Sequence, residues 1–460
     1  MRISRAIALG AVSAMLLAGC TTNVYEEGAF AGGGGGDAAD AAGGGGGGGN
    51  EADNTGQVLV SGANTGVEGA ALQEIYDTYV NEAQDDFTVT YSGSDGFEQE
   101  VILQIEGGTP PDVASFPQPG AVIEQAEQGN LVALEDLGYD IEELNSRFGE
   151  YLVSLGEYDG KHYGIPDLVN FKSAVWYNVP AFEEGGYETP ETWDELIALS
   201  DQMVADGLTP WCLGTGSDAA TGWPGTDWIE DITLRQAGVD DYDAWVNGEL
   251  PFSSDSIKRS WELFGDIIFT DGYVLGGANN ISGNDFRDAP DPMFQDPPQC
   301  MMHRQATFIT NFFPGAGSDD ELTAGEDYDF FPFPDIDGNS GALMAGQMLA
   351  IFRNAPEVKE YLDLYTAQEP QCALGTIAGI SFISPRLDVG EDCYDNIIIA
   401  QAAGTLNEAL NSGVARFDGS DLMPPEVGSG EFWNSMNNYT DSGPDNLDDV
   451  LASIDAAFGN

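Results

Sequence analysis

Residues 57–93 read QVLVSGANTGVEGAALQEIYDTYVNEAQDDFTVTYSG. The apolar residues 58–60 predict a short buried strand, residues 68–83 predict a helix, and the alternation over residues 87–91 predicts a second strand. A strand, a helix and a strand in this order form a unit in which the two strands lie parallel and the helix covers one face. The stretch therefore predicts an α/β fold built on a parallel sheet.

Helices and strands continue to alternate after this unit. Residues 96–106 predict a helix, residues 112–115 a strand, and residues 120–129 a further helix that ends at a glycine. Thr192 and Glu195 precede an apolar face at the spacing of a capping box, which marks the start of a helix. With 460 residues, 42% of them apolar, the chain is long enough for two lobes.

The N-terminus has the features of an export signal. Two arginines precede the apolar run 6–18, which is shorter than the roughly 20 residues that a membrane span needs. Residues 17–20, LAGC, resemble the site at which bacterial lipoproteins are cleaved and lipidated. We therefore expect residues 1–19 to be a signal peptide and Cys20 to carry lipid. The alternative is an ordinary cleaved signal in which Cys20 is incidental.

Residues 20–56 predict a lipid-anchored, flexible tether. Two glycine runs, 32–36 and 43–49, fill much of the segment, and glycine loses much entropy on ordering while burying nothing apolar. A lipid anchor holds a chain at a surface without spanning the membrane. We expect an extracytoplasmic protein on the outer face of the cell membrane.

The chain is strongly acidic. Its 78 acidic residues against 14 basic ones give a formal net charge of −64, which argues against nucleic acid or anionic lipid as a partner. Self-repulsion of this size destabilises a compact state unless salt screens it, and the Debye length falls to about 3 Å at 1 M salt. We interpret the charge as a sign of a saline habitat, with a merely acidic exported protein as the alternative.

This interpretation predicts that the melting temperature rises between dilute buffer and molar salt, because screening weakens the repulsion between carboxylates. Thermal unfolding at the two salt concentrations measures the change. A melting temperature that stays level or drops would contradict the interpretation.

Four cysteines follow Cys20, and an even number in an exported chain indicates two disulfides. Four cysteines allow three pairings, and the sequence alone does not choose among them. We favour Cys372 with Cys393, which closes a short loop, and Cys212 with Cys300, which spans the middle segment.

No catalytic or metal-binding motif stands out. The sequence has no G-x-S-x-G, H-E-x-x-H or CxxC motif and only two histidines. Residues 335–339, DIDGN, lack the later glutamate of a calcium loop and predict a turn. We expect no catalytic residue, no metal and no cofactor.

Aromatic residues beside glycine, proline and short polar residues recur in the loops. A flat ring packs against the apolar face of a sugar, while carboxylate, amide and ammonium groups bond its hydroxyls. A single tryptophan is more often a core residue, but placement in loops favours a site. The clearest groups are Phe116 with Gln118, Asn170 with Lys172, Trp223 with Asp227 and Trp228, Phe312 with Phe313, and Trp433.

Several stretches form an ordered series along the body of the chain. They are GGTPPDVASFPQPG (107–120), DGKHYGIP (159–166), WYN (176–178), TPETWDEL (189–196), TGWPGTDWIEDI (221–232) and PPEVGSGEFW (424–433). The series resembles the extracytoplasmic solute-binding lipoproteins of carbohydrate ABC importers, in particular the maltodextrin and α-glucoside binding group. The resemblance covers roughly residues 57–455.

The resemblance implies a two-lobe periplasmic-binding-protein fold with three interlobe crossings and a ligand cleft that closes by a hinge. The crossings are expected near Pro166, Pro334 and Ser384. The expected boundaries are residues 57–166 plus 340–383 for lobe one, and residues 167–335 plus 384–460 for lobe two.

The resemblance also implies roles for the candidate residues. Glu68, Phe116 and Gln118 belong to the wall of lobe one, and Asn170 and Lys172 lie just past the first crossing. Phe312 and Phe313 form the aromatic platform of lobe two, and Trp433 stacks near the chain end. Trp223, Asp227 and Trp228 lie in a loop at the rim whose length varies within the family.

The expected function is therefore the capture of an oligosaccharide, an α-glucoside in the first place, for delivery to a membrane permease. We expect a monomer that makes and breaks no bond. The rival interpretations are a surface glycoside hydrolase, a binding lipoprotein for a peptide, a polyol or another non-sugar solute, and a structural adhesion protein. A peptide binder would be expected to use arginine for the carboxylate, and few bases lie near the aromatic loops.

Overall fold

The strand-helix-strand unit predicted for residues 57–93 is present in the computed structural model, which describes residues 56–315, 322–377 and 381–459. Strand β1 (Gln57–Gly62) pairs in parallel with β2 (Thr88–Gly93). Helix α1 (Gly66–Tyr76) connects them and continues as a π-helix at Asp77–Asn81. The predicted α/β class is confirmed.

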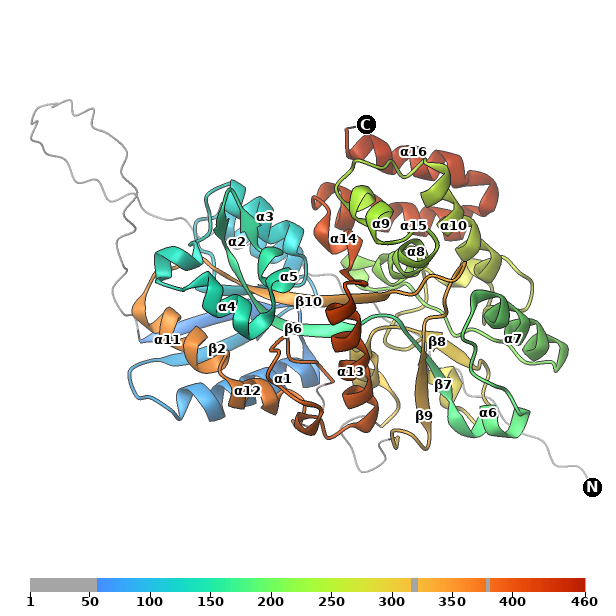
Figure 1. Ribbon diagram of the computed structural model, residues 1–460, viewed down its shortest axis with the longest axis horizontal. Coiled ribbons are helices and arrows are strands. Elements are labelled where there is room, and N and C mark those ends of the chain that lie inside the picture. The colour runs from blue at the N-terminus through green and yellow to red at the C-terminus, as the bar shows by residue number, and fades with distance from the viewer. Residues whose placement is uncertain (1–55, 316–321, 378–380, 460) are drawn as a thin grey trace, which may run out of the picture. The chain divides into compact units, whose positions relative to one another are not determined.

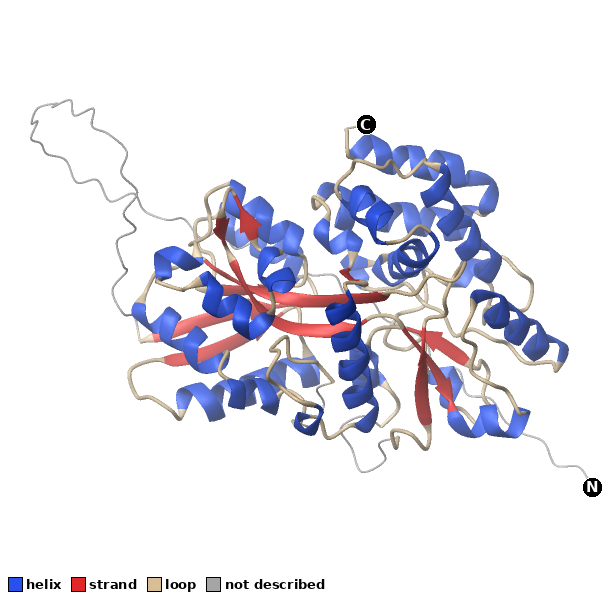
Figure 2. Cartoon of the chain, viewed as in Figure 1, coloured by secondary structure: helices blue, strands red, loops and turns tan. Residues whose placement is uncertain are grey.

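The remaining helices and strands come in runs rather than in alternation, since residues 157–178 hold strands only and the elements of residues 179–268 are all helices (Figure 2). The strands are β3 (Val113–Phe116), β4 (Glu157–Tyr158), β5 (Lys161–His162), β6 (Gly164–Phe171), β7 (Ala174–Asn178), β8 (Met302–Arg304), β9 (Tyr328–Pro332), β10 (Ala342–Ile351) and β11 (Ala415–Phe417). The α-helices are α2 (Phe97–Glu106), α3 (Pro119–Glu127), α4 (Ile141–Phe148), α5 (Glu150–Ser154), α6 (Val179–Gly185), α7 (Trp193–Ala205), α8 (Trp223–Gln236), α9 (Val239–Val246), α10 (Asp255–Ile268), α11 (Pro356–Tyr365), α12 (Gln368–Ala373), α13 (Ile397–Ser412), α14 (Gly419–Leu422), α15 (Trp433–Ser442) and α16 (Leu447–Ala457). A second π-helix spans Glu426–Phe432.

The local signals in the sequence agree with these elements. Helix α2 and strand β3 lie within one residue of their predicted bounds, and α3 is followed by Gly129 with a φ of +75°. Thr192 and Glu195 form the predicted capping box at the start of α7. Segments whose ends are marked by a capping residue or a glycine were therefore predictable from the sequence.

Two main sheets organise the described residues. The larger has the strand order β11-β10-β3-β1-β2, with β6 paired to β10, and the smaller has the order β8-β7-β9. Strands β1, β2 and β3 are parallel, whereas β10 runs antiparallel to both β3 and β6. Figure 1 shows β6 and β10 side by side, running from the helices around β1 to β3 towards those around β7 to β9.

Strand β10 contributes to all four apolar clusters of the described chain. Leu349 packs with the residues of β1, β2 and α11, and Met348 packs with those of α2, β3 and α3. Leu343 joins the cluster around α7, α8 and α10, and Met344 joins the cluster around β7 and α13. A strand buried on both faces reads as a nearly continuous apolar run, as residues 342–351 do apart from Gln347.

Both disulfides have the favoured pairing. Cys212 is bonded to Cys300 with a Cα–Cα distance of 5.4 Å, and Cys372 is bonded to Cys393 with a Cα–Cα distance of 5.0 Å. Loops of 88 and 21 residues are closed in this way, and closing a loop stabilises a fold by restricting the unfolded chain.

Several predictions concern other parts of the chain. The signal peptide, Cys20 and the tether up to residue 55 lie outside the described residues. None of the described helices combines the length and the apolarity that crossing a membrane requires. Residues 49–460 form a single compact unit, so the lobe boundaries stay a prediction.

Candidate binding site

A cavity of about 200 Å³ lies at the carboxyl ends of the parallel strands. The loops after β1, β2 and β3 form one side, as expected for an open α/β sheet, in which ligands bind beyond the carboxyl ends of the strands. Strands β6 and β10 and the segments 217–223, 286–312 and 418–433 supply the remaining walls. The cavity is thus lined by parts of the chain that lie far apart in sequence.

One wall of the cavity is aromatic. Its members are Trp223, Phe286, Phe308, Phe312 and Trp433. The Trp223 ring packs edge-on against Phe286 with a centroid distance of 5.0 Å, and Phe286 packs edge-on against Phe312 at 5.7 Å. These rings pack on one another and also line the cavity. The wall can therefore pack against the apolar faces of a sugar.

Gly222 brings the two tryptophans of this wall together. Its φ is +122°, and a Cβ at this position would lie 2.4 Å from the carbonyl oxygen of Trp433. Only glycine accepts both this backbone conformation and this close approach. Helix α8 can therefore begin at Trp223 directly against the backbone of Trp433.

A second wall of the cavity carries Asn64, Glu68 and Gln347, which hydrogen bonds link to one another and to Asn311, a buried residue outside the lining. Glu68 accepts from Asn64 Nδ2 at 3.2 Å and from Asn311 Nδ2 at 2.9 Å, and Asn64 Oδ1 accepts from Gln347 Nε2 at 2.8 Å. Burial raises the pKa of Glu68, while the two amides lower it. These groups offer acceptors and donors at fixed positions, which suits a polyhydroxylated ligand.

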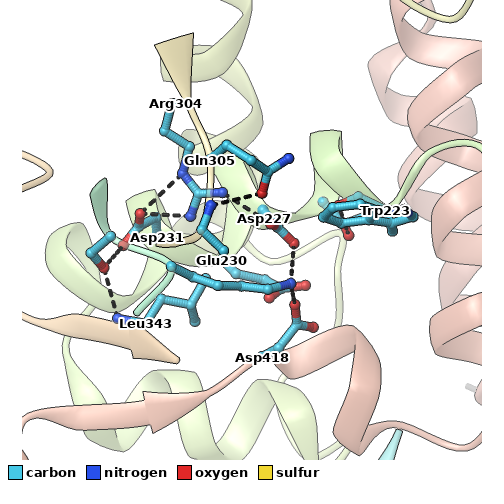
Figure 3. Close-up of polar contacts among 12 residues, drawn as sticks. Trp223, Asp227, Glu230, Asp231, Arg304, Gln305, Leu343 and Asp418 are labelled. Atoms are coloured by element: carbon cyan, nitrogen blue, oxygen red, sulfur yellow. Dashed lines mark hydrogen bonds and ion pairs between the residues drawn. The ribbon is translucent and has the colours of Figure 1, made fainter. Parts of the chain in front are cut away.

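A buried cluster of charges supports the floor of the cavity (Figure 3). The Lys172 ammonium forms ion pairs with Asp227, at 2.8 Å, and with Asp418. Arg304 binds Asp227 at 3.1 Å and Asp231 at 2.7 Å. All five side chains are buried, so the charges are held by one another rather than by water.

The protonation states in this cluster follow from burial and from Lys172. Burial alone would raise the pKa of Asp418, but the Lys172 ammonium outweighs it and lowers that pKa to about 2. Burial raises the pKa of Asp227 to about 6 and that of Glu230 well above its usual range. A neutral Glu230 carboxyl can therefore share a hydrogen with the Asp418 carboxylate.

Asp227, Glu230 and Asp418 lie close enough together to hold a metal ion. The Lys172 ammonium, however, lies between Asp227 and Asp418 and already provides their counter-charge. This grouping of carboxyls is therefore explained without a metal.

Arg287 lies at the edge of the cavity and joins distant segments. Its guanidinium contacts Asp285 at 2.9 Å, Asp218 at 3.4 Å and Asp95 at 3.5 Å. Asp95 follows β2, whereas the other two follow β7 in sequence, so one arginine ties both sides of the cavity rim. These partly exposed pairs are screened by salt and hold weakly.

The predicted site residues divide into two groups. Those that line the cavity are Glu68, Gln118, Asn170, Lys172, Trp223, Phe312 and Trp433. Those that do not are Phe116, Asp227, Trp228 and Phe313, which lie in the apolar clusters or, for Asp227, in the buried charge cluster. Whether the lining residues bind the ligand stays a prediction.

Each of the three predicted aromatic residues that do not line the cavity packs against another ring. Phe116 packs edge-on against Phe97 at 5.4 Å between ring centroids. Trp228 packs edge-on against Trp211 at 5.0 Å, and Phe313 packs against Phe294 at 4.8 Å. These rings contribute to folding from the core, which corrects their expected placement at the cavity.

Sequence reasoning missed several lining residues. Among them are Asn64, Phe286, Arg287, Phe308, Gln347, Asp418 and Asp421. Phe286 and Arg287 belong to a long segment of turns without hydrophobic periodicity, which gives no positional signal. Asn64 could have been found, because it lies in the loop after the first predicted strand, where a ligand of an α/β sheet is expected.

Residues 62–371 match the family described as bacterial extracellular solute-binding protein. The chain is 36% identical over 416 residues to the alpha-glucosides-binding periplasmic protein AglE of Rhizobium meliloti, covering 88% of each chain. It is 34% identical over 392 residues to the osmoprotective compounds-binding protein GgtB of Synechocystis sp., covering 85% of this chain and 90% of that protein.

Solved structures share the fold. The solute-binding protein RafE in complex with raffinose has a TM-score of 0.66 at 19% identity, covering 87% of this chain and 98% of that chain. Maltose-bound MalE3 of T. maritima also has a TM-score of 0.66, at 17% identity and the same coverage. The chain belongs to the bacterial extracellular solute-binding protein family and is a binding protein rather than an enzyme.

Proposed function

We propose that this chain is the substrate-binding component of an ABC sugar importer, which captures an oligosaccharide of the α-glucoside class and delivers it to a membrane permease. The observation that carries the proposal is the cavity itself, which is lined both by aromatic rings and by amides and carboxyls. Apolar ring faces and equatorial hydroxyls are the two surfaces of a pyranose, and each has a counterpart here. The α-glucoside specificity of the similar Rhizobium protein supports the choice of sugar.

Binding would proceed without chemistry on the ligand. The ligand enters between the segments on the two sides of the cavity, and closure about a hinge buries it against Trp223, Phe312 and Trp433. The closed form is then the one that docks on the permease. Burial of most of the ligand surface allows about micromolar affinity, near −8 kcal/mol.

Three further parts of the proposal concern the cell. Residues 1–19 direct export, Cys20 carries the lipid, and residues 20–56 act as a tether to the outer face of the cell membrane. The resemblance of residues 17–20 to a lipoprotein cleavage site and the glycine runs support this arrangement. The receptor acts as a monomer.

A second candidate ligand class is an osmoprotective glycoside. Two observations favour it: the similar Synechocystis protein binds osmoprotective compounds, and the net charge of −64 suits a saline habitat. Both classes are neutral and polyhydroxylated, so the same cavity walls serve either.

A thermal-shift panel at molar salt tests the proposal, with maltose, maltotriose, trehalose, sucrose, raffinose and glucosylglycerol as probes. A probe at 100 times its dissociation constant stabilises the protein by about 2.7 kcal/mol, and we expect at least one glycoside to do so. Mannitol serves as a polyol control without a ring. If no glycoside shifts the melting temperature, the proposal is contradicted.

A further inference from the structure

Among the residues that the structure describes, the carboxyl group of Asp421 has no hydrogen-bond or ion-pair partner. Asp421 belongs to the short helix α14, is 7% exposed and lines the cavity. Its backbone N–H donates to Asp418 Oδ1 at 3.0 Å, but among the described residues no donor or cation bonds its carboxyl oxygens. The other buried carboxyls around it are all held, Glu68 by two amides and Asp418 by Lys172 and Ser420.

An unpaired buried carboxyl is destabilising. Burial raises the pKa of Asp421 well above its usual range, and Asp418 raises it further. The nearest cation, Lys172, is already bonded to Asp227 and Asp418. Burying a carboxyl without a donor is unfavourable in either protonation state, and most strongly for the charged form.

The backbone around Asp421 cannot relax to expose it. The Glu230 carboxyl accepts hydrogen bonds from the N–H groups of Gly419 and Ser420, at 3.0 and 3.1 Å. Gly428 and Gly120 pack so closely that a Cβ would lie 1.9 Å from the Ser420 carbonyl oxygen and 2.3 Å from that of Met423. These contacts fix the backbone around Asp421, so the Asp421 carboxyl stays beside the cavity.

We propose that Asp421 is a ligand-contacting residue whose carboxyl accepts hydrogen bonds from two neighbouring hydroxyls of the bound glycoside. This inference rests on the proposed function for the identity of the ligand. A vicinal diol presents two hydroxyl donors at the spacing of the two carboxylate oxygens. Binding would therefore give the Asp421 carboxyl the hydrogen-bond donors that it lacks among the described residues. Asp421 then discriminates for ligands that carry such a diol.

The same argument predicts a trade-off that needs no ligand. Asparagine at position 421 needs neither a buried charge nor the uptake of a proton on folding, so ligand-free Asp421→Asn protein is expected to melt at a higher temperature than the wild type at pH 8. A carboxyl whose pKa is raised in the folded state destabilises the fold as pH increases above the unfolded value, near 3.9. The stabilisation by the substitution should therefore shrink as pH falls towards 4.

The charged and titratable groups that act on Asp421 are Asp418 on its own segment, Lys172 at the cavity, Asp227 in the buried charge cluster and Glu98 on α2. All of them remain in the variant. The difference between the two melting curves against pH therefore reports on Asp421.

The binding arm uses calorimetric titration with trehalose, sucrose and maltose, and with choline as a small organic cation. We expect Asp421→Asn to weaken the best of the three sugars by about tenfold, because a charged hydrogen-bond acceptor becomes a neutral amide. Glu426→Gln makes the same change of net charge at an exposed residue outside the cavity and should leave the affinity unchanged.

The outcomes separate the inference from the proposed function. Wild-type binding of a sugar that Asp421→Asn weakens, with the higher melting temperature at pH 8, supports both. Equal affinities for wild type and variant overturn the role of Asp421 and leave the proposed function standing. Binding of choline alone, lost in the variant, would show that Asp421 contacts a cation and would contradict both the hydroxyl contact and a glycoside as the ligand. Binding of none of the four probes also contradicts both.

Discussion

Trp433→Ala protein is expected to bind its sugar on the order of a hundredfold more weakly than the wild type. Trp433 lines the cavity, and its indole Nε1 donates to Ser420 Oγ at 3.3 Å, which fixes the ring. Removing an aromatic surface of this size from a ligand contact forfeits roughly 2 to 3 kcal/mol. Calorimetric titration with the best glycoside measures the change.

Trp228→Ala is the matched control for this prediction. Both tryptophans are nearly fully buried, at 6% exposed for Trp433 and 1% for Trp228, but only Trp433 touches the cavity. Both variants should melt at lower temperatures because each leaves a void in packed surroundings. Only Trp433→Ala should lose affinity in the fraction that remains folded, and equal affinities would remove Trp433 from the site.

Lys172→Met is expected to destabilise the protein by about 3 to 5 kcal/mol, because it leaves the Asp227 and Asp418 carboxylates buried without their ammonium. For a chain of this size that loss corresponds to a drop in melting temperature of about 5 °C. Burial alone would lower the pKa of Lys172, but Asp227 and Asp418 raise it instead, so the ammonium stays charged at acidic and neutral pH.

The pH dependence of this variant is a sharper test. In the wild type the pKa of Asp418 is lowered to about 2, so the ion pair stabilises the fold above the unfolded pKa near 3.9 and loses that effect as pH falls towards 2. Without Lys172, only the hydrogen bonds from Glu230 and Ser420 oppose burial, so the pKa of Asp418 is expected to be higher than in the wild type. The loss in Lys172→Met should therefore shrink as pH falls.

Lys161→Met controls for the removal of a lysine. Lys161 pairs with Asp136 at 2.9 Å, but both side chains are about half exposed, so no measurable change in melting temperature is expected. If Lys172→Met protein melts at the same temperature as the wild type, the buried ion pairs contribute nothing to stability.

Much of the fold was predictable because its signals are local. The alternation in residues 87–91, the capping box at Thr192 and the glycine after α3 each act within a few residues. Strands β3 and β6 are buried on both faces, so the period that separates core from solvent is absent there. Phe116 could therefore not be assigned to the core from its sequence context.

The sequence predicted which segments approach the site, but not which residue of each segment lines the cavity. Trp223 and Trp228 are five residues apart on α8, which places their side chains about 140° apart around the helix axis, so one faces the cavity and the other the core. Phe312 and Phe313 divide in the same way. Among 78 acidic residues, nothing local distinguishes Asp418 and Asp421, because their roles depend on Lys172 and on packing across the fold.

Strand β10 sets a limit on how this receptor can be taken apart. Because ten consecutive residues supply side chains to every apolar cluster of the described chain, neither half possesses a complete interior of its own. A fragment of the chain without β10 would therefore lack part of its apolar core. We expect the two fragments of a fluorescent sensor split within β10 to fold only after they have bound to each other.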